Sequence, residues 1–189
     1  MVPSVTDTDQ APADAGTLLA SIGGVYDHVA HAVPRIAAVL PLYRDLLGGV
    51  PVMAGISPWG GHLAVQFDFG GGGRLELLEP TRPDAPSIGR FLAQNPRGGL
   101  HHVTFKVKDL EAAIEVMTGA GYTMIGTLLD NDRWRETFLH PRQTAGVLIQ
   151  LAQAAPGIPA PIDRPLEEFL AEAAQLRHAS GMVDEPGTA

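Results

Sequence analysis

The chain has 189 residues, of which 45% are hydrophobic and 18% charged, with no cysteine and a formal net charge of −8. This composition is typical of a globular protein with one compact domain or two small ones. The negative charge argues against nucleic acid or an anionic membrane as a partner, and no apolar run reaches the ~18 residues of a membrane span. Disulfides and thiolate metal sites are excluded, so any metal must be held by nitrogen and oxygen. We expect a cytoplasmic protein.

The first half of the chain shows one strand, one helix and three further strands. Alternating apolar residues predict a strand over Val25–Val33, and Pro34 opens a helix whose apolar positions recur every 3.6 residues as far as Leu47. Pro41 inside this helix predicts a kink. The three further strands are expected over Val50–Ile56, His62–Phe69 and Gly73–Glu79. The glycine run 70–73 joins two strands and precedes no helix, so it predicts a hairpin turn rather than a phosphate-binding loop.

The second half of the chain repeats this order of elements. A strand is expected over His101–Val107, and Asp109 is a suitable N-cap for a helix that begins at Leu110. Three strands are then expected over Tyr122–Leu128, Trp134–Leu139 and Ala145–Leu151. Each half is therefore predicted to be a βαβββ module, and the repeat of a whole module order indicates a duplication.

The repeat aligns polar residues that lie inside apolar strands. An offset of 74 takes His28 to His102 (102 − 28) and Glu76 to Gln150 (150 − 76). We predict an α+β fold in which two paired βαβββ modules form a cupped mixed sheet around a central cleft. The predicted parts are a mobile N-terminal tail (1–22), a first module (23–80), a connector (81–98), a second module (99–153), and a C-terminal extension (154–189) with one helix over Leu166–Arg177. The extension is expected to pack on the body or on a second subunit.

Alternation along the strands predicts that the four aligned polar residues share one cleft. His28 and His102 lie on the strand face opposite the valines that pack on the helices, and Glu76 and Gln150 lie opposite their flanking leucines and isoleucine. Two imidazoles, a carboxylate and an amide oxygen suit a divalent ion such as Zn, Ni, Co, Mn or Fe. Such a metal would polarise a substrate carbonyl and stabilise an enolate.

Other polar residues in the strands are interpreted as structural. By strict alternation His101 lies on the side opposite His102, so we expect it to be a structural neighbour of the site. His31 and His140 are expected to be packed or hydrogen-bonded, and Glu79, at a strand end before Pro80, is expected to be solvated. Glu76 differs, because a carboxylate inside a Leu-Glu-Leu-Leu run is costly to bury unless it is paired or bound to a metal.

Three short motifs resemble those of a known superfamily. They are DHVA at 27–30, GLHH at 99–102, and HP at 140–141 followed by GVLIQL at 146–151. Together they resemble the vicinal oxygen chelate superfamily and, within it, methylmalonyl-CoA epimerase and related glyoxalase-like proteins, over about residues 24–153. The resemblance implies paired modules around a divalent metal, with the ligand positions on His28, Glu76, His102 and Gln150. It also implies a homodimer.

The last of these positions departs from the family pattern. Epimerases and glyoxalases usually have a glutamate there, which can act as a proton-transfer base, whereas an amide such as Gln150 can bind metal through oxygen but cannot accept a proton near neutral pH. The pattern also has a glutamate on the third strand of the first module, where Gln66 lies nearest and Asp68 follows two residues on. Gln150 and Asp68 are thus the candidate catalytic residues, with Asp68 as the remaining candidate base.

Together with the resemblance, these residues predict a metal-dependent enzyme of the isomerase or lyase type. It would act on a small carbonyl or acyl-CoA-like substrate through a metal-stabilised enolate, and it would not be a standard methylmalonyl-CoA epimerase, because two-base epimerisation needs a base on each face of the carbon. Two alternatives stay open. The two-His, one-carboxylate set also suits an Fe(II) dioxygenase, and Gln150 also fits a metal-free, resistance-type protein that binds a small molecule.

Overall fold

The computed structural model describes residues 18–182 of the chain. Most of the predicted N-terminal tail therefore lies outside the described residues. The helices and strands, in chain order, are α1 (Leu18–Ser21), β1 (Val25–Ala32), α2 (Ile36–Leu40), the π-helical turn η1 (Pro41–Leu46), β2 (Val50–Ser57), β3 (His62–Asp68), β4 (Arg74–Pro80), α3 (Ile88–Gln94), β5 (Gly99–Lys106), α4 (Leu110–Gly119), β6 (Met124–Leu128), β7 (Trp134–Leu139), the 3₁₀ turn η2 (Pro141–Gln143), β8 (Leu148–Ala154) and α5 (Leu166–Ala179).

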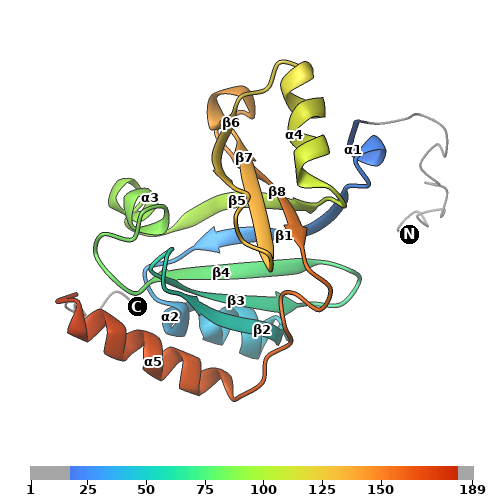
Figure 1. The fold of residues 1–189 in the computed structure, drawn as a ribbon. Helices are drawn as coiled ribbons and strands as arrows, with labels where there is room; N and C mark the ends of the chain where they lie inside the picture. The colour runs from blue at the N-terminus through green and yellow to red at the C-terminus, as the bar shows by residue number, and fades with distance from the viewer. Residues whose placement is uncertain (1–17, 183–189) are drawn as a thin grey trace, which may run out of the picture.

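The eight strands form one mixed sheet with an internal symmetry. Their order is β2-β3-β4-β1-β5-β8-β7-β6. In each half the first strand runs parallel to the last, β1 beside β4 and β5 beside β8, and the two first strands pair antiparallel at the centre. The sheet bends sharply at this central pair, so that β2–β4 and β6–β8 extend in different directions (Figure 1). The predicted α+β fold with two paired βαβββ modules is confirmed.

Helices cover the outer face of each half and supply its core. In the first half, α2 and α5 lie together against β2–β4 (Figure 1), and the buried side chains there include Ile36, Phe67 and Phe169. In the second half, α4 packs on β7 and β8, with Leu110 and Leu151 fully buried. Helix α5 of the C-terminal extension therefore completes the core of the first half. No helix in the described range 18–182 is long and apolar enough to cross a membrane.

The element boundaries follow from local backbone chemistry. The α-helical stretch of the first module ends at Leu40, and Pro41 begins a π-helical turn because proline has no N–H to bond to the preceding turn. Gly70, Gly71 and Gly72 all have positive φ, so the glycine run forms the predicted hairpin turn. The strand predicted from Ala145 begins only at Leu148 instead, because a turn through Ala145 (φ 54°) precedes it.

The expectation that Glu79 would be solvated was wrong. Glu79 is only 3% exposed, rather than solvated. Its Oε2 accepts a 2.7 Å hydrogen bond from the Ile36 N–H at the start of α2, and its Oε1 lies 3.7 Å from Nε of Arg177 on α5. Burial raises the pKa of Glu79, against the lowering effects of the Ile36 N–H, Arg35 and Arg177. The carboxylate thus joins α2, β4 and the C-terminal helix.

Candidate metal centre

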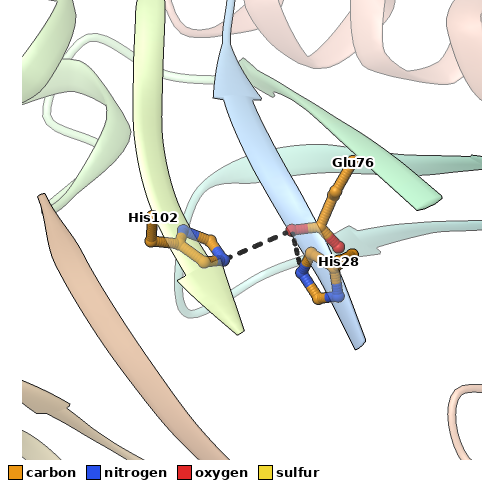
Figure 2. A group of neighbouring side chains, drawn as sticks. All are labelled: His28, Glu76 and His102. Atoms are coloured by element: carbon orange, nitrogen blue, oxygen red, sulfur yellow. Dashed lines mark ion pairs between the residues drawn. The ribbon is translucent and has the colours of Figure 1, made fainter. Parts of the chain in front are cut away.

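Three of the four predicted ligands converge on one point in the structure. His28 of β1, Glu76 of β4 and His102 of β5 are 2%, 8% and 6% exposed. Nε2 of His28 and Nε2 of His102 lie 3.4 and 3.7 Å from Oε2 of Glu76 (Figure 2). One ligand atom from each residue lies within 4.8 Å of the other two. This spacing fits three ligands around one ion.

The register of the three central strands explains why these side chains meet. Ala30 of β1 pairs with Glu76 on one side and with His102 on the other. Residues paired across neighbouring strands point to the same face, and His28 lies two positions from Ala30 on that face. The Ala30 side chain is fully buried and small, which leaves room above it for three larger polar groups.

Two β-bulges between β1 and β5 bring additional side chains to this face. The pairing steps from Tyr26 to His28 against one step on β5, so Asp27 is an extra residue. A second shift makes His101 the extra residue between the pairs of Ala30 and His31. The prediction that His101 points away from His102 was therefore wrong, because a bulge interrupts strict alternation.

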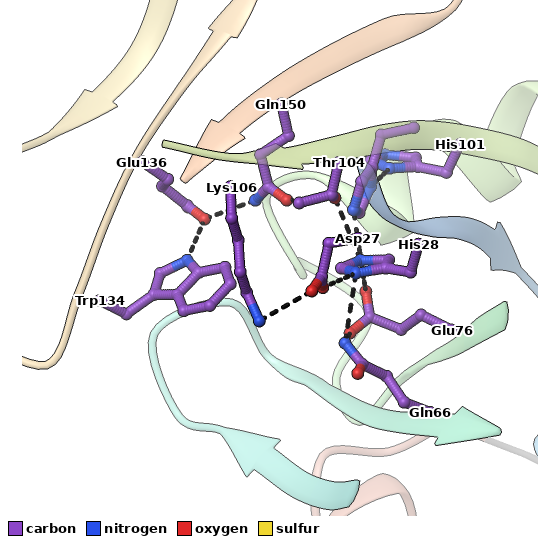
Figure 3. A network of polar contacts seen from close by, with 11 residues as sticks. Asp27, His28, Gln66, Glu76, His101, Thr104, Lys106, Trp134, Glu136 and Gln150 are labelled. Carbon is purple, nitrogen blue, oxygen red and sulfur yellow. Dashed lines mark hydrogen bonds and ion pairs between the residues drawn. The ribbon is translucent and has the colours of Figure 1, made fainter. Parts of the chain in front are cut away.

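The first bulge places a carboxylate against His28. Oδ2 of Asp27 lies 2.7 Å from Nδ1 of His28, and Nζ of Lys106 lies 2.8 Å from Oδ1 of Asp27 (Figure 3). Burial alone would lower the pKa of His28, but hydrogen bonds and charge interactions with Asp27 and Glu76 raise it to about 9. Burial alone would raise the pKa of Asp27, but its hydrogen bonds and charge interactions with His28 and Lys106 lower it to about 2. Without a metal, His28 is thus a cation between two carboxylates.

The second bulge brings His101 against His102, which burial keeps neutral. Nδ1 of His101 lies 2.9 Å from Nδ1 of His102, and Nε2 of His101 lies 3.2 Å from the Ser87 hydroxyl. Burial lowers the pKa of His102 to about 3, against the opposing effect of Glu76. Its Nε2 is buried and has no hydrogen-bond partner among the described residues. An unpartnered imidazole nitrogen beside a carboxylate is the donor that a divalent ion needs, so the residues present fit a metal.

Glu76 completes this set as a ligand that is ionised near neutral pH. Burial alone would raise its pKa, but hydrogen bonds and charge interactions with His28, His102 and Gln66 lower it to about 2. The amide of Gln66 on β3 donates to Oε1 of Glu76 at 3.1 Å. Oε2 of Glu76 lies on the side of the two histidines. The neighbouring amide therefore orients the carboxylate toward the cluster.

The Thr104 side chain lies between Gln150 of β8 and His28 of the cluster. Oε1 of Gln150 accepts a 2.6 Å hydrogen bond from the Thr104 hydroxyl, which lies 3.1 Å from Nε2 of His28. Its Nε2 donates to Oε2 of Glu136 at 2.7 Å (Figure 3). The two contacts set the orientation of the amide, with its oxygen on the side of Thr104 and His28.

Asp68 is not brought to the cluster. It lies at the end of β3 opposite Arg74, and its Oδ1 accepts a 2.7 Å hydrogen bond from the Gly70 N–H in the hairpin turn. Among the described residues, no hydrogen bond or ion pair joins Asp68 to His28, Glu76 or His102. The residue of β3 that contacts the cluster is Gln66, so the structure gives no support to Asp68 as the base.

The sequence interpretation missed several polar residues around the centre, among them Asp27, Thr104, Trp134 and Glu136. Glu136 accepts hydrogen bonds from Gln150 and from Nε1 of Trp134, the latter at 2.8 Å. Burial raises its pKa, against those two hydrogen bonds. The position of Glu136 could have been predicted from strand alternation. Trp134, Glu136 and Phe138 lie on one face of β7, and Phe138 pairs with Gln150. Asp27 gives no such signal, since it reaches the face only through a bulge.

Comparison with known proteins gives one consistent match. Residues 27–140 match the model of the Glyoxalase/Bleomycin resistance protein/Dioxygenase superfamily. Over 137 residues the chain is 35% identical to the mitochondrial methylmalonyl-CoA epimerase of Mus musculus, covering 69% of this chain and 74% of that one. It is 34% identical to an ethylmalonyl-CoA/methylmalonyl-CoA epimerase of Cereibacter sphaeroides, covering 69% and 98%. The structure of methylmalonyl-CoA epimerase from Mycobacterium tuberculosis has a TM-score of 0.64 at 27% identity, covering 77% and 95%.

Proposed function

Because this chain belongs to the Glyoxalase/Bleomycin resistance protein/Dioxygenase superfamily, we propose that it is a metal-dependent enzyme of the isomerase or lyase type. The observation that carries the proposal is the buried cluster of His28, Glu76 and His102, in which Nε2 of His102 has no partner among the described residues. A divalent ion held there would supply a Lewis acid for negative charge that develops on a substrate carbonyl oxygen.

Neighbouring residues orient the side chains that would bind the metal. Asp27 holds Nδ1 of His28, so that Nε2 faces the cluster, and His101 does the same for His102. Thr104 and Glu136 orient the amide of Gln150, whose oxygen can serve as a fourth ligand. In this assignment His28 and His102 bind as neutral imidazoles and Glu76 as the anion.

The substrate class is an acyl-CoA or a similar small carbonyl compound. The named activities of the relatives, ethylmalonyl-CoA and methylmalonyl-CoA epimerase, support an acyl thioester. In such a compound the carbonyl oxygen takes up charge when a proton leaves the neighbouring carbon. A buried site with a fixed electrostatic environment favours that charge more than water does.

The chain is proposed to differ from a standard methylmalonyl-CoA epimerase in its proton-transfer groups. Gln66 and Gln150 flank the cluster on opposite sides, and neither amide can accept a proton near neutral pH. Glu136 is a flanking carboxylate that makes no ion pair with another described residue, and burial raises its pKa. One base supports isomerisation or elimination from one face of a carbon, whereas epimerisation needs a base on each face.

A second candidate is an Fe(II) dioxygenase. The cluster is a two-histidine, one-carboxylate set, which is the ligand set of many non-haem iron oxygenases. Substrate-dependent oxygen uptake by the Fe(II)-loaded protein would favour it over the isomerase or lyase proposal. Unchanged oxygen concentration, with product formed under argon, would exclude it.

The first test of the proposal is metal binding by the full chain. We expect the purified protein to bind about one Zn, Ni, Co, Mn or Fe ion, and Glu76→Ala and His102→Ala to lose it. His178→Ala, an exposed histidine on α5, is the matched control and should keep the metal. Less than about 0.1 metal ion per chain, with no uptake of any of the five ions, would refute the enzyme proposal and favour a metal-free binding protein.

The second test separates a one-base reaction from epimerisation. The two epimers of methylmalonyl-CoA are incubated separately with metal-loaded protein in D2O, and deuterium at the α-carbon is followed by NMR. We expect exchange in one epimer without conversion to the other, and loss of exchange in Glu136→Gln. Interconversion of the epimers by the wild-type protein would show that it is a standard epimerase after all.

A further inference from the structure

Two adjoining cavities lie beside the cluster, between the first half of the sheet and the C-terminal extension. Their volumes are about 500 and 430 Å³, and both are lined by Met53, Pro159 and Pro161. The larger cavity is also lined by Trp134, which donates a hydrogen bond to Glu136. Segment 158–164 contributes to the walls of both cavities. This segment lies beyond residues 27–140, the part that matches the superfamily model.

The smaller cavity reaches the metal centre through Gln66. Gln66 is 2% exposed, and its Nε2 donates to Glu76 of the cluster. Its Oε1 is buried with no hydrogen-bond partner among the described residues, although the side chain lines the cavity. An unpartnered buried oxygen is costly, so it points to a ligand or solvent group that occupies this space when the site is filled.

The segment that forms the outer wall is firmly attached. The Ile162 N–H donates to the Val52 carbonyl at 3.1 Å, and the Ile162 side chain packs on the core of the first half. Arg164 pairs with Glu168 and Glu172, and its guanidinium lies 3.9 Å from the centre of the Phe169 ring. The wall is therefore a fixed part of the fold rather than a loose tail.

Each cavity is lined by an arginine that makes no ion pair among the described residues. Arg74 lines the smaller cavity and Arg133 the larger, and neither makes an ion pair with any residue in the described range 18–182. Asp163 also lines the larger cavity, and Asp68 is the cross-strand neighbour of Arg74. In a chain with net charge −8, two unpaired arginines at one channel favour an anionic ligand.

We propose that segment 158–164 of the C-terminal extension is the outer wall of the substrate channel, and that Arg74 and Arg133 in this channel bind the negative groups of an elongated substrate. The inference rests on the proposed function, because it assigns the inner end of the channel to the metal centre at Gln66. The ligand chemistry is a phosphate or a carboxylate, from either the tail of an acyl-CoA or a small dianion.

The test measures binding of two probes to the full chain by titration calorimetry. Propionyl-CoA carries phosphates at a distance from its carbonyl, and malonate carries two carboxylates without a tail. Ala160→Trp fills the larger cavity from the exposed wall, and the double variant Arg74→Gln, Arg133→Gln removes the charges. Ala171→Trp is the matched control, because Ala171 is an exposed alanine of the same extension outside both cavities. Melting temperatures and metal content are recorded for every variant.

We expect each channel variant to weaken binding of at least one probe by about tenfold or more, with Ala171→Trp unchanged and metal content equal throughout. Loss for propionyl-CoA identifies a phosphate-bearing tail as the ligand, and loss for malonate alone identifies a small dianion. Equal affinities in all proteins, or no binding of either probe to the wild-type protein, would overturn the channel. A metal-free wild type whose probe binding still depends on Ala160 and Arg74 would contradict the proposed function and support the channel.

Discussion

Metal binding at the cluster should release one proton near neutral pH, and His28 should be its source. In the metal-free protein Asp27 and Glu76 raise the pKa of His28 to about 9, so the ring is protonated at pH 7. Coordination through Nε2 requires that this nitrogen lose its proton, while Nδ1–H stays on Asp27. Glu76, with a pKa of about 2, and His102, with a pKa of about 3, are already in the forms that bind. The expected count is therefore one proton per ion.

The same pKa sets the size of the pH effect on affinity. Below the pKa of His28 the metal competes with a proton, so the association constant should rise about tenfold per pH unit and level off near pH 9. From pH 7 to pH 9, where half of His28 is still protonated, the gain is about 50-fold, or about 2.3 kcal/mol. An unperturbed histidine with a pKa near 6.5 would give almost no change over this range.

Calorimetric titration with Co²⁺ measures the count directly. The apparent enthalpy at pH 7 is recorded in buffers with different ionisation enthalpies, and its slope gives the number of protons released. Asp27→Asn removes one of the two carboxylates that raise the His28 pKa, so its count at pH 7 should be smaller. A wild-type count near zero, with affinity constant between pH 7 and pH 9, would refute the assignment of His28 as a protonated ligand.

Three further predictions concern stability. The contribution of His28 to the stability of metal-free protein should be complete below its ordinary pKa of 6.5 and should be lost as the pH rises through about 9, as measured by urea unfolding with EDTA. Gln150→Glu places a second carboxylate beside Glu136, so the melting temperature of metal-free protein should fall, at a cost of about 1–3 kcal/mol, and metal should restore it. Phe169→Ala should lower the free energy of unfolding by about 3–5 kcal/mol, because it empties a buried position. In the same urea assay, Leu176→Ala at an exposed position should lower it by less than about 1 kcal/mol. Equal losses in the two variants would contradict the packing of α5.

Much of this architecture could be predicted because its determinants are periodic. The apolar stripe of each helix and the alternation of each strand place β1, β5 and the helices after them without knowledge of the fold. The offset between His28 and His102 then predicts that both lie at the central pair of strands. Alternation alone assigns Glu76 to the same face, and the register at Ala30 is the physical reason.

The parts that escaped prediction depend on single-residue shifts and distant contacts. A β-bulge adds one residue to a strand without a characteristic side chain, so Asp27 and His101 could not be placed on the face of the cluster. The burial of Glu79 depends on Arg177, which is 98 residues later in the chain (177 − 79). The position of Asp68, the candidate base, could not be predicted either. Its carboxylate accepts a hydrogen bond from the Gly70 N–H, and this contact depends on the geometry of the turn.

The central pairing of β1 with β5 also determines when in folding the cluster can form. His28 lies 48 residues before Glu76 (76 − 28) and 74 before His102 (102 − 28), so the three ligands meet only after two long chain segments have closed. A separate half of the chain holds at most two of them. Bound metal should therefore slow amide hydrogen exchange most in the strands that exchange only by global unfolding, and metal capture should follow the slowest folding step rather than accelerate it.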